Sequence, residues 1–93
     1  MKAHYDPEEA LLAEVLTESG PIHELTVFND DVNTFDHVID TLIDVCDHDP
    51  IQAQQCTLII HYNGKCGVKR GTFDKLEPLC TAIHDRGLSA DIL

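Results

Sequence analysis

The sequence predicts an α+β domain in which a small antiparallel sheet is packed with three helices, in the order β-α-α-β-α-β. Three stretches follow a helical pattern and start after residues that favour helix N-termini. Strand-like runs precede, separate and follow these stretches. The length of 93 residues suits one small domain with a limited core. We therefore expect a core domain over residues 21–93, preceded by an N-terminal arm over residues 1–20.

The arm has its own helix signal. Asp6-Pro7-Glu8-Glu9 resembles a capping box with proline at the first helical position. An apolar stripe follows it, made of Leu11, Leu12, Val15 and Leu16. We expect a short helix over residues 7–17, which Ser19-Gly20-Pro21 ends. A helix of this length is unstable alone in water, so it must pack on its own domain or on a partner.

The first strand and the first core helix follow the arm. Residues 23–28 alternate loosely between polar and apolar side chains and predict a strand, and residues 29–32 form a loop. Asn33 is expected to cap a helix over residues 34–46, with Asp36 near the positive end of that helix. The apolar residues of the helix follow helical spacing: Phe35, Val38, Ile39, Leu42, Ile43, Val45 and Cys46.

The second core helix is predicted over residues 50–62. It starts at Asp49, which forms a capping box with Gln52, and it ends at Asn63-Gly64. Apolar residues lie on most sides of this helix: Ile51, Ala53, Cys56, Leu58, Ile59, Ile60 and Tyr62. A helix that is apolar on so much of its surface is expected to be largely buried.

The last part of the chain predicts a strand, a helix and a final strand. Residues 65–70 form the strand, and either Thr72 or Asp74 caps the helix, which runs to about Arg86. Gly87 ends the helix, and residues 88–93 form the final strand.

Composition restricts the function classes. The formal net charge of −11 argues against binding nucleic acid or anionic lipid and favours cationic partners. The chain shows no secretory signal and no run long enough to span a membrane, so we expect a cytoplasmic protein with reduced thiols. The four cysteines form no C-x-x-C pair: Cys46, Cys56, Cys66 and Cys80. We therefore expect no metal and no cofactor.

A polar cluster at the ends of two elements points to amine binding. Asn29, Asp30 and Asp31 follow the first strand, and His61 lies near the end of the second core helix. Their amide, carboxylate and imidazole groups accept hydrogen bonds and lie beside apolar residues. This combination suits a cationic amine attached to an apolar group, and it lacks an activated nucleophile, so we expect no enzyme.

Two other classes of function remain open from the residues alone. A hydrolase would use Cys66 as nucleophile with His61 as base, although the sequence offers no oxyanion loop. A protein–protein interaction module of related fold, such as a ribosomal stalk-like domain, would bind its partner independently of a free N-terminus.

Four motifs, in order and at nearly matching spacing, resemble the ClpS family of adaptors of the ATP-dependent Clp protease. They are Thr26-Val27-Phe28-Asn29-Asp30-Asp31, Val38-Ile39-Asp40, His61-Tyr62 with Gly64-Lys65, and Cys66-Gly67-Val68. The resemblance covers residues 23–93. It implies an adaptor that binds the free N-terminal Leu, Phe, Tyr or Trp of N-degron substrates. It also implies delivery of these substrates to a Clp-family AAA+ unfoldase through the N-terminal extension. A monomer is the default expectation for an adaptor, and the sequence leaves the oligomeric state open.

The resemblance also implies roles for individual residues. Asn29, Asp31 and His61 would hold the α-amino group, with Asp30 alongside. Apolar pocket positions of the family match Val38 and Ile60.

Three positions depart from the family pattern. Phe35 and Thr57 stand where many members have methionine, and Asn33 replaces a frequent threonine at the helix cap. The first two changes reshape the pocket and leave open the ranking among Leu, Phe, Tyr and Trp.

Overall fold

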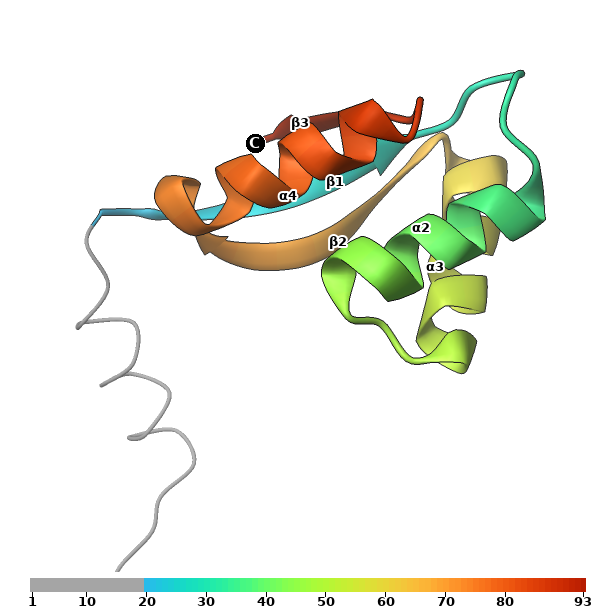
Figure 1. The fold of residues 1–93 in the computed structure, drawn as a ribbon, viewed down its shortest axis with the longest axis horizontal. Coiled ribbons are helices and arrows are strands. Elements are labelled where there is room, and N and C mark those ends of the chain that lie inside the picture. The colour runs from blue at the N-terminus through green and yellow to red at the C-terminus, as the bar shows by residue number, and fades with distance from the viewer. Residues whose placement is uncertain (1–19) are drawn as a thin grey trace, which may run out of the picture.

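The structure is a computed structural model that describes residues 20–93, so the predicted arm helix over residues 7–17 lies outside the described residues. The described elements are β1 (Ile22–Phe28), α2 (Phe35–Cys46), α3 (Pro50–Asn63), β2 (Lys65–Thr72), α4 (Phe73–Asp85) and β3 (Ser89–Ile92) (Figure 1). Their order confirms the predicted β-α-α-β-α-β arrangement and the α+β class.

The sheet has the strand order β2-β1-β3, and both pairings are antiparallel. The register of β1 against β2 shifts between Leu25, which pairs with Lys69, and Thr26, which pairs with Gly67. Val68 therefore has no partner in the ladder, and the strand carries a bulge at this residue.

A buried histidine binds the carbonyl of this bulge. His48 is only 5% exposed, and its Nε2 lies 2.7 Å from the carbonyl oxygen of Val68. Because a carbonyl oxygen only accepts, Nε2 carries the proton and donates it. The other ring nitrogen, Nδ1, is buried and has no hydrogen-bond partner among residues 20–93. The ring thus joins the connection between α2 and α3 to the sheet.

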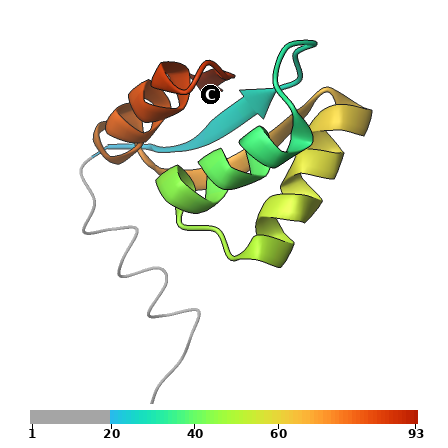
Figure 2. The same ribbon diagram turned by 45° about the vertical axis from the view of Figure 1, so that its right-hand side comes forward.

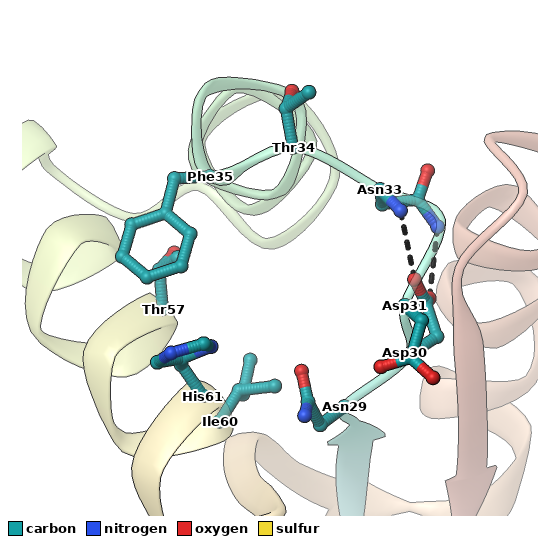
Figure 3. Close-up of a pocket in the computed structure, with 9 residues that line it drawn as sticks. All are labelled: Asn29, Asp30, Asp31, Asn33, Thr34, Phe35, Thr57, Ile60 and His61. Atoms are coloured by element: carbon teal, nitrogen blue, oxygen red, sulfur yellow. Dashed lines mark hydrogen bonds between the residues drawn. The ribbon is translucent and has the colours of Figure 1, made fainter.

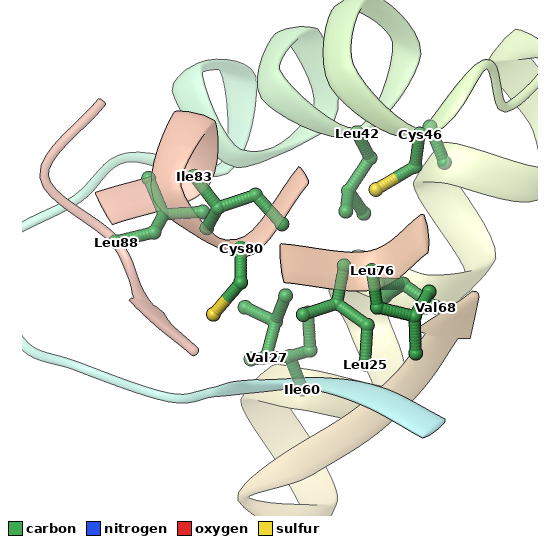
Figure 4. Close-up of a cluster of buried hydrophobic side chains, with 11 residues drawn as sticks. Leu25, Val27, Leu42, Cys46, Ile60, Val68, Leu76, Cys80, Ile83 and Leu88 are labelled. Carbon is green, nitrogen blue, oxygen red and sulfur yellow. The ribbon is translucent and has the colours of Figure 1, made fainter. Parts of the chain in front are cut away.

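The hydrophobic core lies where the three helices meet one face of the sheet (Figure 4). Leu25 and Val27 of β1 point into it and are no more than 1% exposed. The other buried members come from all three helices, from β2 and from the segment before β3: Leu42, Cys46, Ala53, Ile60, Val68, Leu76, Cys80, Ile83 and Leu88. The alternation of side chains along β1 places these two residues on the same face.

Helices α2 and α3 form an antiparallel pair beside the sheet (Figure 2). The Asp49 side chain caps α3 as predicted, because its Oδ1 accepts a hydrogen bond of 2.8 Å from the Gln52 backbone N–H. Gly64 ends α3 with a φ of 89°, a conformation that favours glycine. Because the two helices run in opposite directions, the start of α2 lies next to the end of α3, where the rings of Phe35 and His61 are in contact.

The prediction that α3 is largely buried is wrong. Only Ala53, Thr57 and Ile60 of this helix are buried. Four apolar residues stay exposed, by 41% to 78%: Ile51, Leu58, Ile59 and Tyr62. The helix packs on α2 and β2 along one side only, so its remaining apolar residues face outward. Within residues 20–93, no helix has both the length and the apolar character needed to cross a membrane.

The sequence left two candidates, Thr72 and Asp74, for the N-cap of α4, and the structure distinguishes them. β2 extends to Thr72, two residues beyond the predicted end, and Thr72 is the N-cap of α4. Asp74 lies inside the first turn, so the alternative cap there is wrong. Pro78 lies within the helix.

Candidate functional site

A cavity of about 320 Å³ opens where the end of β1 and the loop after it meet α2 and α3 (Figure 3). Nine residues line it: Asn29, Asp30, Asp31, Asn33, Thr34, Phe35, Thr57, Ile60 and His61. This volume lies at the small end of the range for ligand pockets and suits a single side chain. The lining includes two carboxylates and neither lysine nor arginine.

Eight of the nine residues predicted from the sequence for this site line the cavity, and Val38 does not. Val38 is half-buried and packs against the hydrophobic core, one turn after Phe35. Helical geometry points the side chain of Val38 along the same side of α2 as Phe35, where it packs on the core and does not line the cavity. Thr34 is the one lining residue that was not predicted.

Asn29 lies on the cavity rim because a backbone hydrogen bond joins the two polar segments. The Asn29 N–H donates to the carbonyl oxygen of Gly64 at 2.9 Å. Gly64 ends α3 three residues after His61, so this bond holds the end of β1 beside the end of α3. The Asn29 side chain is exposed, and its amide points toward the cavity (Figure 3).

Asp30 organises the loop that carries the two carboxylates. Its Oδ1 accepts hydrogen bonds from the backbone N–H groups of Val32 (2.9 Å) and Asn33 (2.8 Å). Its Oδ2 accepts one from the Asn33 side-chain amide at 2.8 Å. The backbone bond from Asn33 holds the pKa of Asp30 below its ordinary value of 3.8, and the bonds from the Asn33 side chain and from Val32 act in the same direction.

Asn33 ties this loop to the far end of α4 and does not cap α2. Its side-chain amide donates to the carbonyl oxygen of Gly87 at 2.9 Å as well as to Asp30. The cap is Thr34, whose Oγ1 accepts a hydrogen bond from the His37 N–H at 3.1 Å. The predicted cap at Asn33 is therefore wrong by one residue. Asparagine and threonine are both favoured at the N-cap of a helix, so residue type alone does not decide which of two neighbouring residues caps it.

An aromatic pair forms one wall of the cavity. The rings of Phe35 and His61 have centroids 5.0 Å apart and meet edge to face at 70°. The His61 ring also contacts Tyr62, with centroids 4.9 Å apart. Thr57 and Ile60, which are 3% and 4% exposed, form the deeper part of the cavity. The site thus combines polar acceptors on the rim with an apolar and aromatic interior.

The pKa of Asp30 predicts an acid-dependent loss of loop stabilisation. A depressed folded-state pKa stabilises the fold above the ordinary value of 3.8, and this contribution is lost as the pH falls through the folded-state value. Asp30→Asn replaces the Oδ2 acceptor by a donor facing the Asn33 amide. We expect Asp30→Asn to be less stable than the natural chain at pH 7, and the difference to shrink below pH 4. Urea unfolding at pH 7, 4 and 3 measures it, and a constant difference would contradict this role.

The thiols do not form a site. Among residues 20–93 no group of three or more possible metal ligands comes together. Burial raises the pKa of Cys66 to about 11, and the neighbouring Cys56 thiol acts in the same direction. A protonated thiol is a poor nucleophile. Cys66 also lies outside the cavity lining, so the geometry does not favour a hydrolase built on Cys66 and His61.

Fold and site together define a small α+β domain with a negatively charged, side-chain-sized cavity. A family model described as ATP-dependent Clp protease adaptor protein ClpS matches residues 18–91. A comparison with curated proteins gives no match. Because the matched region spans most of the chain, the chain belongs to the ClpS family.

Membership gives the chain the general role of a Clp protease adaptor. The family is one of adaptors that interact with Clp proteases and is not a catalytic family.

Proposed function

We propose that the cavity binds the free N-terminal residue of N-degron substrates, with Leu, Phe, Tyr or Trp as the first residue. The observation that carries this proposal is the arrangement of the cavity, in which hydrogen-bond acceptors surround an apolar and aromatic interior. An α-ammonium group has three donors and one positive charge, and it is joined by one carbon atom to the first side chain. The acceptors suit the ammonium group, and the interior suits the side chain.

In this proposal Asn29, Asp31 and His61 accept hydrogen bonds from the α-amino group. Asp30 acts mainly by shaping the loop, because both of its carboxylate oxygens already accept bonds within the loop. The ring nitrogen of His61 that faces the amine accepts only when it is unprotonated. Charge-assisted hydrogen bonds of this kind contribute about 1.5–3 kcal/mol each.

The first side chain enters the interior beside Phe35, Thr57 and Ile60. Burial of one leucine or phenylalanine side chain contributes about 1.5–3 kcal/mol. One side chain and one amine thus supply enough recognition for an adaptor, with affinity limited by the cost of association. The negative charge of the chain favours the approach of a cationic N-terminus.

An adaptor of this kind must also deliver its bound substrate to a protease. We propose that the adaptor acts as a cytoplasmic monomer and hands its substrates to a Clp-family AAA+ unfoldase. Residues 1–20 are the proposed docking segment, because their apolar stripe needs a surface to pack on.

Acetylation of the peptide amine tests the proposal. A labelled peptide that begins with leucine is titrated with the full chain by fluorescence polarisation, beside the same peptide acetylated at its N-terminus. Acetylation removes the charge and two donors, so we expect binding to fall by about 100-fold or more, equivalent to the loss of two charge-assisted bonds. Equal affinity for the two peptides would instead favour an interaction module that does not depend on a free N-terminus.

A further inference from the structure

Thr57 places a hydroxyl group among the apolar residues of the cavity. It lines the cavity from α3, on the same side as His61 and Ile60 (Figure 3), and only 3% of its surface is exposed. A buried polar group is normally hydrogen-bonded. Any donor or acceptor position of the hydroxyl that has no partner within the protein is available for a hydrogen bond with a ligand.

The proton of this hydroxyl is already used. Thr57 Oγ1 donates to the carbonyl oxygen of Ala53, one turn earlier in α3, at 2.7 Å. A carbonyl oxygen only accepts, so the direction of this bond is certain. A hydroxyl oxygen has two further acceptor positions, and among residues 20–93 no donor to Thr57 Oγ1 is found. The cavity therefore offers a hydrogen-bond acceptor from its interior.

Thr57 lies one helical turn before His61 on α3. Thr57 and His61 are four residues apart on α3, so their side chains lie one above the other on one face of the helix. A first residue whose amine is held by Asn29 and His61 would extend its side chain toward Thr57. Tyrosine carries its hydroxyl at the far end of its ring, and tryptophan carries its indole N–H on the ring edge.

We infer that Thr57 is a specificity-determining residue that favours first residues with a side-chain donor, tyrosine above all, over phenylalanine and leucine. This inference rests on the proposed binding of a free N-terminus in the cavity. Phenylalanine or leucine would displace water from the Thr57 oxygen and give it no partner. An acceptor that is desolvated without a partner costs free energy, whereas tyrosine replaces the lost water with its own O–H.

The test compares two peptides that differ only in a first Tyr or Phe, with the natural chain and two variants. The natural chain is expected to bind the Tyr peptide about 2- to 12-fold more tightly, as one neutral hydrogen bond would give. Thr57→Val keeps the shape and removes the acceptor, so this ratio should fall to about 1 or below. Thr57→Ser keeps the hydroxyl and should keep the ratio.

The Tyr-to-Phe ratio tests the role of Thr57, and the response to acetylation tests the binding of a free N-terminus. A Tyr-to-Phe ratio that is the same in the natural chain and Thr57→Val, while both peptides still lose binding on acetylation, would overturn the role of Thr57 alone. A natural chain that prefers Phe would also overturn it. Binding that ignores acetylation for both peptides would overturn the proposed function and the inference with it. Thermal unfolding of each variant confirms that the ratios come from folded protein.

Discussion

Asn29→Ala is expected to weaken binding of a peptide that begins with leucine by about 10- to 150-fold, as the loss of one charge-assisted hydrogen bond would give. The Asn29 side chain makes no hydrogen bond within the described part of the chain and points into the cavity, so its oxygen is free to accept from an amine (Figure 3). Fluorescence polarisation with purified protein measures the change.

Asn29→Asp is the matched control for this experiment. Aspartate has the shape of asparagine, keeps one oxygen as acceptor and adds a negative charge that favours the ammonium group. We therefore expect Asn29→Asp to bind the leucine peptide at least as tightly as the natural chain. Similar losses in Asn29→Ala and Asn29→Asp would show that the amide group is needed for another reason, such as donation to a peptide carbonyl.

Both variants should fold normally, because the structural bond at this position belongs to the backbone. The Asn29 N–H donates to the Gly64 carbonyl whichever side chain is present. The side chain itself is exposed, and exposed substitutions usually change stability by less than about 0.5 kcal/mol. An Asn29→Ala protein that binds the peptide with unchanged affinity would contradict the role of this residue in holding the amine.

Leu42→Ala is expected to lower the free energy of unfolding by about 2.7–5 kcal/mol, the range for leucine in well-packed cores. Leu42 is completely buried where α2 meets the core shared with β1, α3 and α4 (Figure 4). For a domain of this size each kcal/mol lowers the melting temperature by about 4–8 °C. The variant should therefore melt at least about 10 °C below the natural chain.

Ile51→Ala is the matched control, since it also removes a large aliphatic side chain from a helix. Ile51 is 70% exposed, so its truncation removes few contacts and should change stability by less than about 1 kcal/mol. Urea unfolding of both variants gives the comparison. Comparable losses in Leu42→Ala and Ile51→Ala would mean that the outer side of α3 is covered in solution, either by residues 1–19 or by a second copy of the chain.

The order of elements and several of their ends were predictable because the signals are local. The Asp49 cap and the Gly64 end of α3 depend on residues a few positions apart, so the sequence is enough to place them. The helical spacing of apolar residues likewise predicted α2, and its two fully buried apolar positions, Leu42 and Cys46, are part of that pattern. Residue type also identified Asn29 and His61 as polar groups at the ends of apolar elements.

Predictions failed where two similar residues competed or where packing decided the outcome. Asn33 and Thr34 are both suitable N-caps. The Asn33 side chain instead binds Asp30 and Gly87, and Thr34 accepts the capping hydrogen bond from the His37 N–H. The bulge at Val68 was not predicted from the sequence. It depends on the pairing of β2 with β1 and on the hydrogen bond between His48 Nε2 and the Val68 carbonyl oxygen.

The outer side of α3 shows the limit of local patterns most clearly. Its apolar residues surround the helix, and this pattern does not say which side meets the rest of the domain. Only the packing of α3 on α2 and β2 selects Ala53, Thr57 and Ile60 as the buried side.

By itself the sequence determined the α+β class, the order of the elements and the polar residues Asn29, Asp30, Asp31 and His61 as candidates, because spacing, capping and residue chemistry act over short stretches of chain. The tertiary structure alone decided that Asn29 and His61 share one cavity, through the bond between Asn29 and Gly64 and the pairing of α2 with α3. It also decided that the Thr57 oxygen remains an available acceptor. These properties depend on contacts between segments distant in sequence, which compact packing of the whole domain brings together.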